Sequence, residues 1–138
     1  MLARRLAPAI SASILLALTL ARPAAAQTTS AAAWRATPAS LLKSTLRSVA
    51  LAQSRHLGAR GSYAPSVANL GLTLEAGVRV DILAAGPSGW QARATHREQP
   101  GRSCVIFVGR VDGIESPRTE SDREMAGEEG VPLCDRMR

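Results

Sequence analysis

Two cysteines, Cys104 and Cys134, are the side chains in this 138-residue sequence whose chemistry is most readily assigned. In an oxidising compartment, a lone pair of cysteines joins as a disulfide. Closing a loop of about 30 residues in this way stabilises a fold by roughly 3–4 kcal/mol in the chain-entropy description. Two free thiols or half of a metal site are the alternatives, although two cysteines this far apart, with no histidine pair nearby, suit zinc poorly. We therefore predict a Cys104–Cys134 disulfide.

The two histidines, His56 and His96, are the candidates for acid–base catalysis. A nucleophilic side chain needs a base and a group that orients the base, and no Gly-x-Ser-x-Gly signature surrounds a serine. His56 falls at the end of a predicted helix, where a basic residue suits the helix dipole. We interpret both histidines as structural, with a ligand or general-base role for His96 as the alternative. No phosphate-binding glycine loop or dinucleotide motif occurs, so the sequence predicts no enzyme, no cofactor and no metal site.

An acidic stretch spans residues 112–133, which hold seven acidic side chains against two basic ones. Carboxylates and loop carbonyls are the ligands that calcium prefers, but the Asp-x-Asp-x-Asp-Gly pattern of a calcium loop does not occur. We predict a solvated loop that Cys134 tethers to the rest of the domain. The alternative function is a small periplasmic ligand- or ion-binding protein that uses this acidic loop. The acidic residues are Asp112, Glu115, Glu120, Asp122, Glu124, Glu128 and Glu129.

Residues 1–26 have the features of a secretory signal peptide. Arg4 and Arg5 precede a short apolar run over residues 10–20, and three alanines at 24–26 supply a cleavage site before Gln27. The apolar run is about half the length of a bilayer span, which is near 20 residues. An uncleaved anchor and twin-arginine export are the alternatives. We expect export by the general secretory route to the periplasm or the extracellular medium, with no stable membrane insertion after cleavage.

Length and charge exclude several classes of protein. The chain is long enough for one domain and too short for a large enzyme. Its net charge of +6 includes three arginines of the predicted signal peptide, so the remainder carries only +3. The other arginines form no compact cluster with stacking aromatics, and we predict no nucleic-acid binding. Aromatic residues make up only 3% of the chain, and we expect Trp90 to lie in the core.

One amphipathic helix is predicted over residues 38–57. Thr37 is suited to the N-cap and Pro38 to the first helical position, while Gly58 is suited to the end of the helix. The preceding residues 27–37 show no periodicity and are predicted to form a flexible tail. One face of the helix repeats at spacings of three and four residues, through Leu42, Leu46, Val49, Gln53 and Leu57.

The connection over residues 58–77 is rich in glycine but keeps several bulky apolar side chains. We therefore expect it to pack on the helix or the sheet, with a short helical turn at residues 65–69. The apolar side chains are Tyr63, Val67, Leu70, Leu72 and Leu74.

Three strands follow the connection. Residues 78–82 and 90–95 alternate between apolar and polar side chains, whereas residues 104–108 are apolar on both faces and are predicted to form the most buried strand. Short turns at residues 86–89 and 100–101 indicate an antiparallel meander. The sequence thus predicts an α+β fold, with the helix packed on a three- to four-stranded antiparallel sheet and a C-terminal loop closed by the disulfide.

The order and spacing of several short motifs over residues 40–135 resemble the globular head of type IV pilins and type II secretion pseudopilins. The resemblance is carried by the sequence of these motifs along the chain, since each is short. The motifs are Ala52-Gln53, Gly61-Ser62-Tyr63, Leu70-Gly71, Gly77-Val78-x-Val80, Gly89-Trp90, Ala94-Thr95-His96, Cys104 and Cys134.

The resemblance implies a head fold and a structural or recognition role without catalysis. The chain departs from the family at its start, because the first acidic residue is Glu75 and the prepilin peptidase site and apolar stem helix are missing. We therefore expect a signal peptide at 1–26, a tail at 27–37 and a pilin-head-like domain at 38–138. The expected function is an exported, non-catalytic structural or interaction domain whose protein partner belongs to a filament or secretion apparatus.

Overall fold

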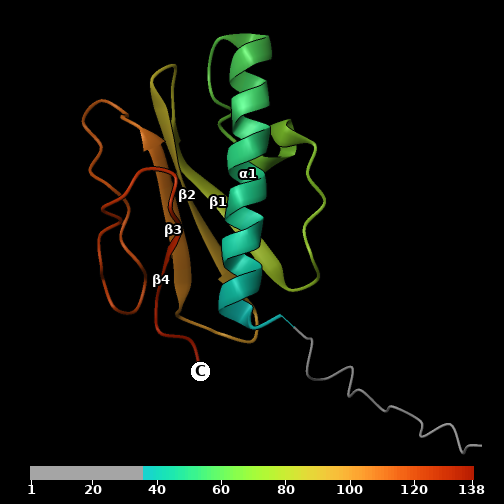
Figure 1. The fold of residues 1–138 in the computed structure, drawn as a ribbon, viewed down its shortest axis with the longest axis vertical. Helices are drawn as coiled ribbons and strands as arrows, with labels where there is room; N and C mark the ends of the chain where they lie inside the picture. The colour runs from blue at the N-terminus through green and yellow to red at the C-terminus, as the bar shows by residue number, and fades with distance from the viewer. Residues whose placement is uncertain (1–35) are drawn as a thin grey trace, which may run out of the picture. The chain divides into compact units, whose positions relative to one another are not determined.

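A computed structural model describes residues 36–138 as one α-helix packed on a four-stranded antiparallel sheet (Figure 1). The predicted α+β class is confirmed. The predicted signal peptide, and all but the last two residues of the predicted tail, lie outside the described residues. No helix within residues 36–138 is both long and apolar enough to cross a bilayer.

The helix α1 spans Pro38–Arg60 and begins as predicted. The side chain of Thr37 accepts a hydrogen bond from the backbone N–H of Ser40, and Pro38 occupies the first turn, where its missing N–H costs nothing.

The predicted end of α1 at Gly58 is wrong. The helix runs through Gly58 and ends at Gly61, whose φ of 74° is left-handed and whose N–H donates to the Leu57 carbonyl. Tertiary contacts explain the extension. The Gln53 side chain exchanges two hydrogen bonds, of 2.7 and 2.9 Å, with the backbone of Ala64. These bonds hold the chain beyond the helix and outweigh the roughly 1 kcal/mol by which a glycine weakens a helix interior.

The sheet consists of β1 (Val78–Ala85), β2 (Gly89–His96), β3 (Ser103–Gly109) and the short β4 (Leu133–Cys134), in the order β1-β2-β3-β4. All neighbouring strands are antiparallel, as the short turns predict. A bulge in β1 between Ile82 and Ala84 shifts its register against β2.

The prediction that the third strand is the most buried is wrong. In β2, six of eight residues are buried, whereas the last three residues of β3, from Phe107 to Gly109, are only half-buried. The reason is position in the sheet. β2 has a full-length strand on each side, while β3 has only the two-residue β4 on its outer edge.

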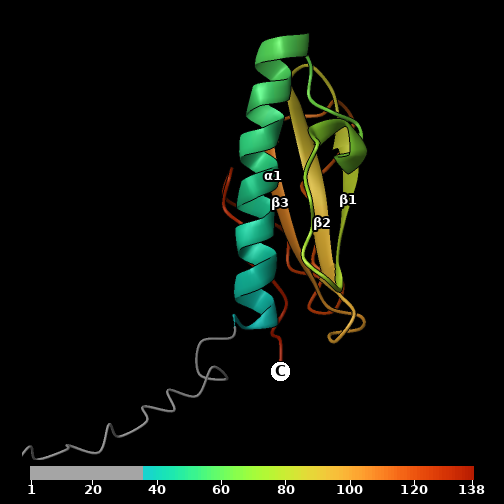
Figure 2. The same cartoon turned by 90° about the vertical axis from the view of Figure 1, so that its right-hand side faces the viewer.

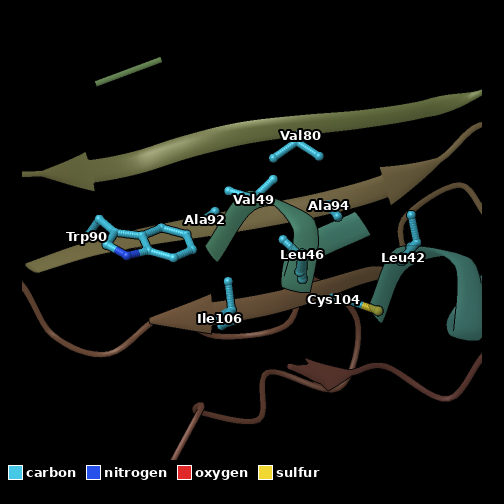
Figure 3. Close-up of a cluster of buried hydrophobic side chains, with 9 residues drawn as sticks. All are labelled: Leu42, Leu46, Val49, Val80, Trp90, Ala92, Ala94, Cys104 and Ile106. Atoms are coloured by element: carbon cyan, nitrogen blue, oxygen red, sulfur yellow. The ribbon is translucent and has the colours of Figure 1, made fainter. Parts of the chain in front are cut away.

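The core lies between α1 and one face of the sheet (Figure 2). Apolar side chains of the helix point at alternate residues of β1, β2 and β3, as the two periodicities require (Figure 3). The cluster contains Leu42, Leu46, Val49, Val80, Trp90, Ala92, Ala94, Cys104 and Ile106.

The connection between α1 and β1 packs against this core, as predicted. The Tyr63 ring lies 6.5 Å from the Trp90 ring, centroid to centroid, and the Tyr63 N–H donates to the Gly86 carbonyl. The expected helical turn is a 3-10 helix, η2 (Val67–Leu70), which starts two residues later than predicted. Trp90 is therefore a core residue, as expected.

Two leucines of α1 provide a matched test of this packing. Leu46 is fully buried, whereas Leu51 is 63% exposed. We expect Leu46→Ala to lower the free energy of unfolding by about 2–5 kcal/mol, because it leaves a cavity under the helix. Leu51→Ala should change it by less than about 0.5 kcal/mol. Urea unfolding followed by circular dichroism measures both, and equal losses would contradict the packing described.

Candidate functional site

The disulfide ties the end of the chain to the sheet. Cys104 in β3 and Cys134 in β4 face each other in register, with their Cα atoms 4.0 Å apart, and they are bonded. The predicted pairing is confirmed, and the alternatives of free thiols and a partial metal site are excluded. The bond closes the 23-residue connection 110–132 between β3 and β4 against the edge of β3. This connection contains all seven carboxylates of the predicted acidic stretch 112–133, and we call it the acidic segment.

A buried carboxylate next to the disulfide holds the same segment. Asp135 is 3% exposed. Its Oδ2 accepts the backbone N–H of Ser103 at 2.7 Å and of Ser121 at 3.1 Å, and its Oδ1 accepts the N–H of Asp122 at 2.6 Å. One side chain thus joins the start of β3, the middle of the acidic segment and the chain end.

Two opposing effects act on the pKa of Asp135. Burial raises the pKa, but the hydrogen bonds from the backbone N–H groups of Asp122, Ser103 and Ser121, with a smaller contribution from Thr119, lower it more. The net result is a pKa below the ordinary value of 3.8. The folded protein therefore favours the ionised carboxylate.

Ser103 completes this anchoring site. Its Oγ accepts the N–H of Glu120 at 2.8 Å, and its carbonyl oxygen accepts the N–H of Asp135 at 2.9 Å. Ser103 and Asp135 are both buried. Since buried polar groups are costly when unpaired, this network determines one position for residues 120–122.

Residues 117–126 form a small irregular hairpin. Arg118 and Met125 make an antiparallel bridge, and the N–H of Thr119 donates to the Glu124 carbonyl at 2.9 Å. Arg123 at the tip has a φ of 56°, which is unusual for a residue other than glycine. As predicted, this stretch is a largely exposed loop without a helix or a named strand, and it is tethered by Cys134. The anchoring site in addition gives it a defined path.

The start of the acidic segment turns onto the sheet face that α1 leaves uncovered. A Cβ on Gly109 would overlap the Ser88 carbonyl oxygen, which accepts the Arg110 N–H at 3.1 Å. Only glycine permits this close turn at the end of β3. Gln91 lies on the face of β2 that points away from α1. Its Nε2 donates a hydrogen bond to the Glu115 carbonyl oxygen at 2.6 Å.

A hollow of about 640 Å³, which we call the groove, lies between this part of the acidic segment and the outer face of the sheet. Phe107, Ile114 and Met125 line it, and the last two are 52% and 48% exposed. Arg110 and Arg118 also line it. Exposed apolar side chains over a groove with charged margins are typical of a protein-binding surface.

Met125 also lines a second hollow. This hollow, of about 500 Å³, is lined by Met125, Val131 and Leu133, and Val131 is also exposed. We call Ile114, Met125 and Val131 the apolar rim. They are three of the five exposed large hydrophobic residues within residues 36–138, so the apolar surface is concentrated on the acidic segment.

The two histidines lie away from this surface and have structural hydrogen bonds. The Nδ1 of His56 is 2.8 Å from the Ser62 carbonyl oxygen beyond α1, and the Nδ1 of His96 accepts the Glu98 N–H at 3.2 Å. Within residues 36–138, no group of three or more His, Cys, Asp or Glu side chains lies close enough together to hold a metal ion.

Sequence reasoning missed Asp135 and Gln91. Asp135 contacts β3 from a position 32 residues away in the chain, and no local motif marks such a pairing. Its only signal was its place directly after Cys134, which the disulfide would bring to β3. Gln91 was assigned to the polar face of a strand, with nothing to indicate what would cover that face.

Comparison of the chain with models of known protein families and with curated proteins found no match.

The anchoring carboxylate predicts a pH-dependent stability. Because the pKa of Asp135 is lower in the folded protein than its ordinary value of 3.8, its contribution is complete at neutral pH and is lost as the pH falls below that value. We expect Asp135→Asn to lower the free energy of unfolding by about 1–3 kcal/mol at pH 7. The difference from the wild type should shrink at acidic pH in urea titrations.

Asp112→Asn is the matched control, because Asp112 is an exposed carboxylate of the same segment. It should change the stability by less than about 0.5 kcal/mol at either pH. An Asp135→Asn protein as stable as the control at pH 7 would show that the carboxylate does not hold the segment.

Proposed function

We propose that this protein is an exported, non-catalytic, pilin-like domain that binds a protein partner through the acidic segment. The observation that carries the proposal is the apolar rim held in one position over a groove. A disulfide and a buried carboxylate hold this segment, although it has almost no regular secondary structure of its own. Ordering a binding surface before the partner arrives lowers the entropic cost of association.

The arrangement of the motifs supports the pilin-like part of the proposal. In this fold the motif residues are links between elements: Gln53 bonds to Ala64, Gly61 ends α1 and Tyr63 packs on Trp90. The resemblance implies this same order of helix, packed connection, meander and disulfide-closed end. The family assigns such heads to filaments and secretion machinery, and we propose a component of that kind as the partner.

The formed disulfide supports export, since structural disulfides persist in oxidising compartments. The core is small and contains one large aromatic, Trp90. A covalent link is a common means of stabilising a small extracellular domain. Together with the predicted signal peptide, this favours the periplasm or the extracellular medium.

The groove also supports a second candidate function: the protein would be a small exported ligand-binding protein, and the groove would be its binding site. Its size of about 640 Å³ is within the range of ligand sites, and Arg110 and Arg118 offer charges for orientation. The exposed apolar rim favours the protein partner, because a small-molecule site buries most of the surface of its ligand, and side chains as exposed as Ile114 and Met125 enclose a small ligand poorly.

Export and cleavage predict the mass of the native protein. Protein isolated unreduced from the producing cell should begin at Gln27 and weigh two hydrogens less than the reduced chain, since Cys104 and Cys134 are bonded. Intact-mass spectrometry before and after reduction measures this. A mass that retains residues 1–26 would instead indicate a membrane stem, and the cleaved-leader part of the proposal would be wrong.

The apolar rim predicts where a partner is crosslinked in the cell. A photo-reactive amino acid at Ile114 or Met125 should give a discrete crosslinked product on illumination. The same amino acid at Leu83, an exposed leucine of β1, is the control and should give none. Identification of the product by mass spectrometry then names the partner. Absence of product at both rim positions, or equal product at Leu83, would contradict the proposed surface.

A further inference from the structure

The groove is lined by equal numbers of positive and negative side chains. Arg110 and Arg118 line it, and so do Asp112 and Glu115, so that the formal charges of the lining cancel. None of the four belongs to an ion pair within residues 36–138. A site of one sign attracts an ion of the other sign, whereas this balanced lining gives an ion little net attraction. The groove therefore favours a neutral ligand that carries a polar group.

The apolar part of the lining has side chains that pack well on an aromatic ring. The thioether of Met125 is unbranched and adaptable, and a methionine sulfur makes favourable contacts with the edge of a ring. The half-buried ring of Phe107 can pack edge-to-face or offset-stacked on a second ring. The exposed Ile114 adds aliphatic surface. An aromatic ligand gains from the sulfur and ring contacts, which an aliphatic side chain cannot make.

Arg118 adds an attraction for the face of the ring. A guanidinium group is attracted to the negative charge density over an aromatic face. The Nη1 of Arg118 donates to the Arg123 carbonyl oxygen at 3.2 Å, which ties the guanidinium group to the hairpin. Arg118 and Met125 form the antiparallel bridge of that hairpin, and residues directly opposite in such a pair have Cβ atoms about 4.5–5.5 Å apart on one face. Both side chains can therefore contact the same ring.

The two carboxylates of the groove supply acceptors for a polar ring. A buried phenol O–H or indole N–H group needs a hydrogen-bond acceptor. The hydrogen bond that Glu115 accepts from Gln91 goes to its backbone carbonyl oxygen and leaves its carboxylate available. Asp112, which is also exposed, lines the same groove. The polar group that suits this lining is thus a donor on an otherwise neutral ring.

The described domain has no exposed aromatic side chain of its own. Trp90 is buried, and Tyr63, which packs against it, is half-buried. Phe107 belongs to the groove itself. Residues 36–138 of a second copy therefore cannot supply the ring. Tryptophan and tyrosine are enriched among the few residues that provide most of the binding energy of a protein interface, so a different protein is the natural source.

We propose that the groove binds the side chain of a tryptophan or tyrosine of the protein partner. In this arrangement the ring contacts Arg118 and Met125. Its N–H or O–H group donates to the carboxylate of Asp112 or Glu115. The proposal rests on the proposed function, since it takes the acidic segment as the surface that binds the partner and names the group that the partner brings.

Ring-current shifts in nuclear magnetic resonance spectra give the first test. The mature protein, isotopically labelled at its methionine methyl groups, carries Met125 in the groove and Met137 packed against the core cluster. N-acetyl-tryptophanamide and N-acetyl-tyrosinamide should shift the Met125 signal with a Kd of about 0.1–1 mM, as expected for ligands of this size. The Met137 signal should not move. No shift of Met125 at about 10 mM ligand would overturn the proposal.

Two comparisons of ligands test the chemistry of the site. N-acetyl-leucinamide has no ring and should bind at least about tenfold more weakly than N-acetyl-tryptophanamide. N-acetyl-phenylalaninamide lacks only the hydroxyl group of N-acetyl-tyrosinamide and should bind at least about threefold more weakly than it does. Equal binding of the leucine and tryptophan ligands would overturn the aromatic site. Equal binding of the phenylalanine and tyrosine ligands would overturn the hydrogen bond to a carboxylate.

Variants of the arginines test the lining itself. Arg110→Ala/Arg118→Ala should weaken the binding of N-acetyl-tryptophanamide at least about fivefold. Arg79→Ala/Arg97→Ala is the matched control, because both residues are exposed outside the groove and the change in net charge is the same. The control should bind within about twofold of the wild type. Equal losses in the two variants, each shown to be folded by circular dichroism, would overturn the proposal.

The occupant of the groove is tested in two further ways. Trp34 lies outside the described residues. A Met125 signal that moves on Trp34→Ala substitution without ligand would show that the chain fills the groove with its own ring, and would overturn the contact with a partner. Indole bound at least about tenfold more tightly than N-acetyl-tryptophanamide would assign the groove to a free aromatic compound and would also overturn that contact.

The crosslinked partner separates this inference from the proposed function. The partner peptide joined to the photo-reactive amino acid at Ile114 should contain a tryptophan or tyrosine, and replacing that residue by alanine should remove the product. A product that persists without the ring would overturn the aromatic contact and leave the proposed function intact. No product at all would contradict the proposed function, whether or not the small ligands bind.

Discussion

The attachment of the chain end to the start of β3 gives the long connection between β3 and β4 its defined path. Cys134 is bonded to Cys104, and the adjacent Asp135 carboxylate accepts N–H groups from Ser103, Ser121 and Asp122. A 23-residue connection is long for a compact domain. Attached at its middle and its end, it becomes a structured part of the surface, and the apolar rim, the groove and the position of the negative charge all follow from that attachment.

The two faces of the sheet are covered in different ways. α1 buries the apolar side of β1, β2 and β3, and it supplies three of the nine core residues, while the strands supply six. On the other face, part of the surface is left to the acidic segment, whose contacts are mainly hydrogen bonds and whose large apolar side chains are exposed. This domain has few aromatic side chains, and the disulfide and the buried carboxylate add to its stability.

Local patterns predicted the elements well where one segment determines its own structure. The Thr37–Pro38 cap, the apolar stripe of α1 and the alternation in β1 and β2 each reflect the geometry of a single helix or strand. The end of α1 at Gly61 was missed, because Gly58 carries the same local signal and the choice depends on Gln53 reaching Ala64. The greater burial of β2 than of β3 was missed, because the order of strands across a sheet is a long-range property.

By itself, the sequence determined the α+β class, the meander and, given export, the pairing of its only two cysteines. These follow from periodicity, turn residues and the absence of any competing thiol. The roles of Asp135, which anchors the acidic segment, and of Ile114 and Met125, which line a groove, became evident only from the tertiary structure. The physical reason is that each of these features joins residues distant in the chain through hydrogen bonds and burial, which no local spacing records.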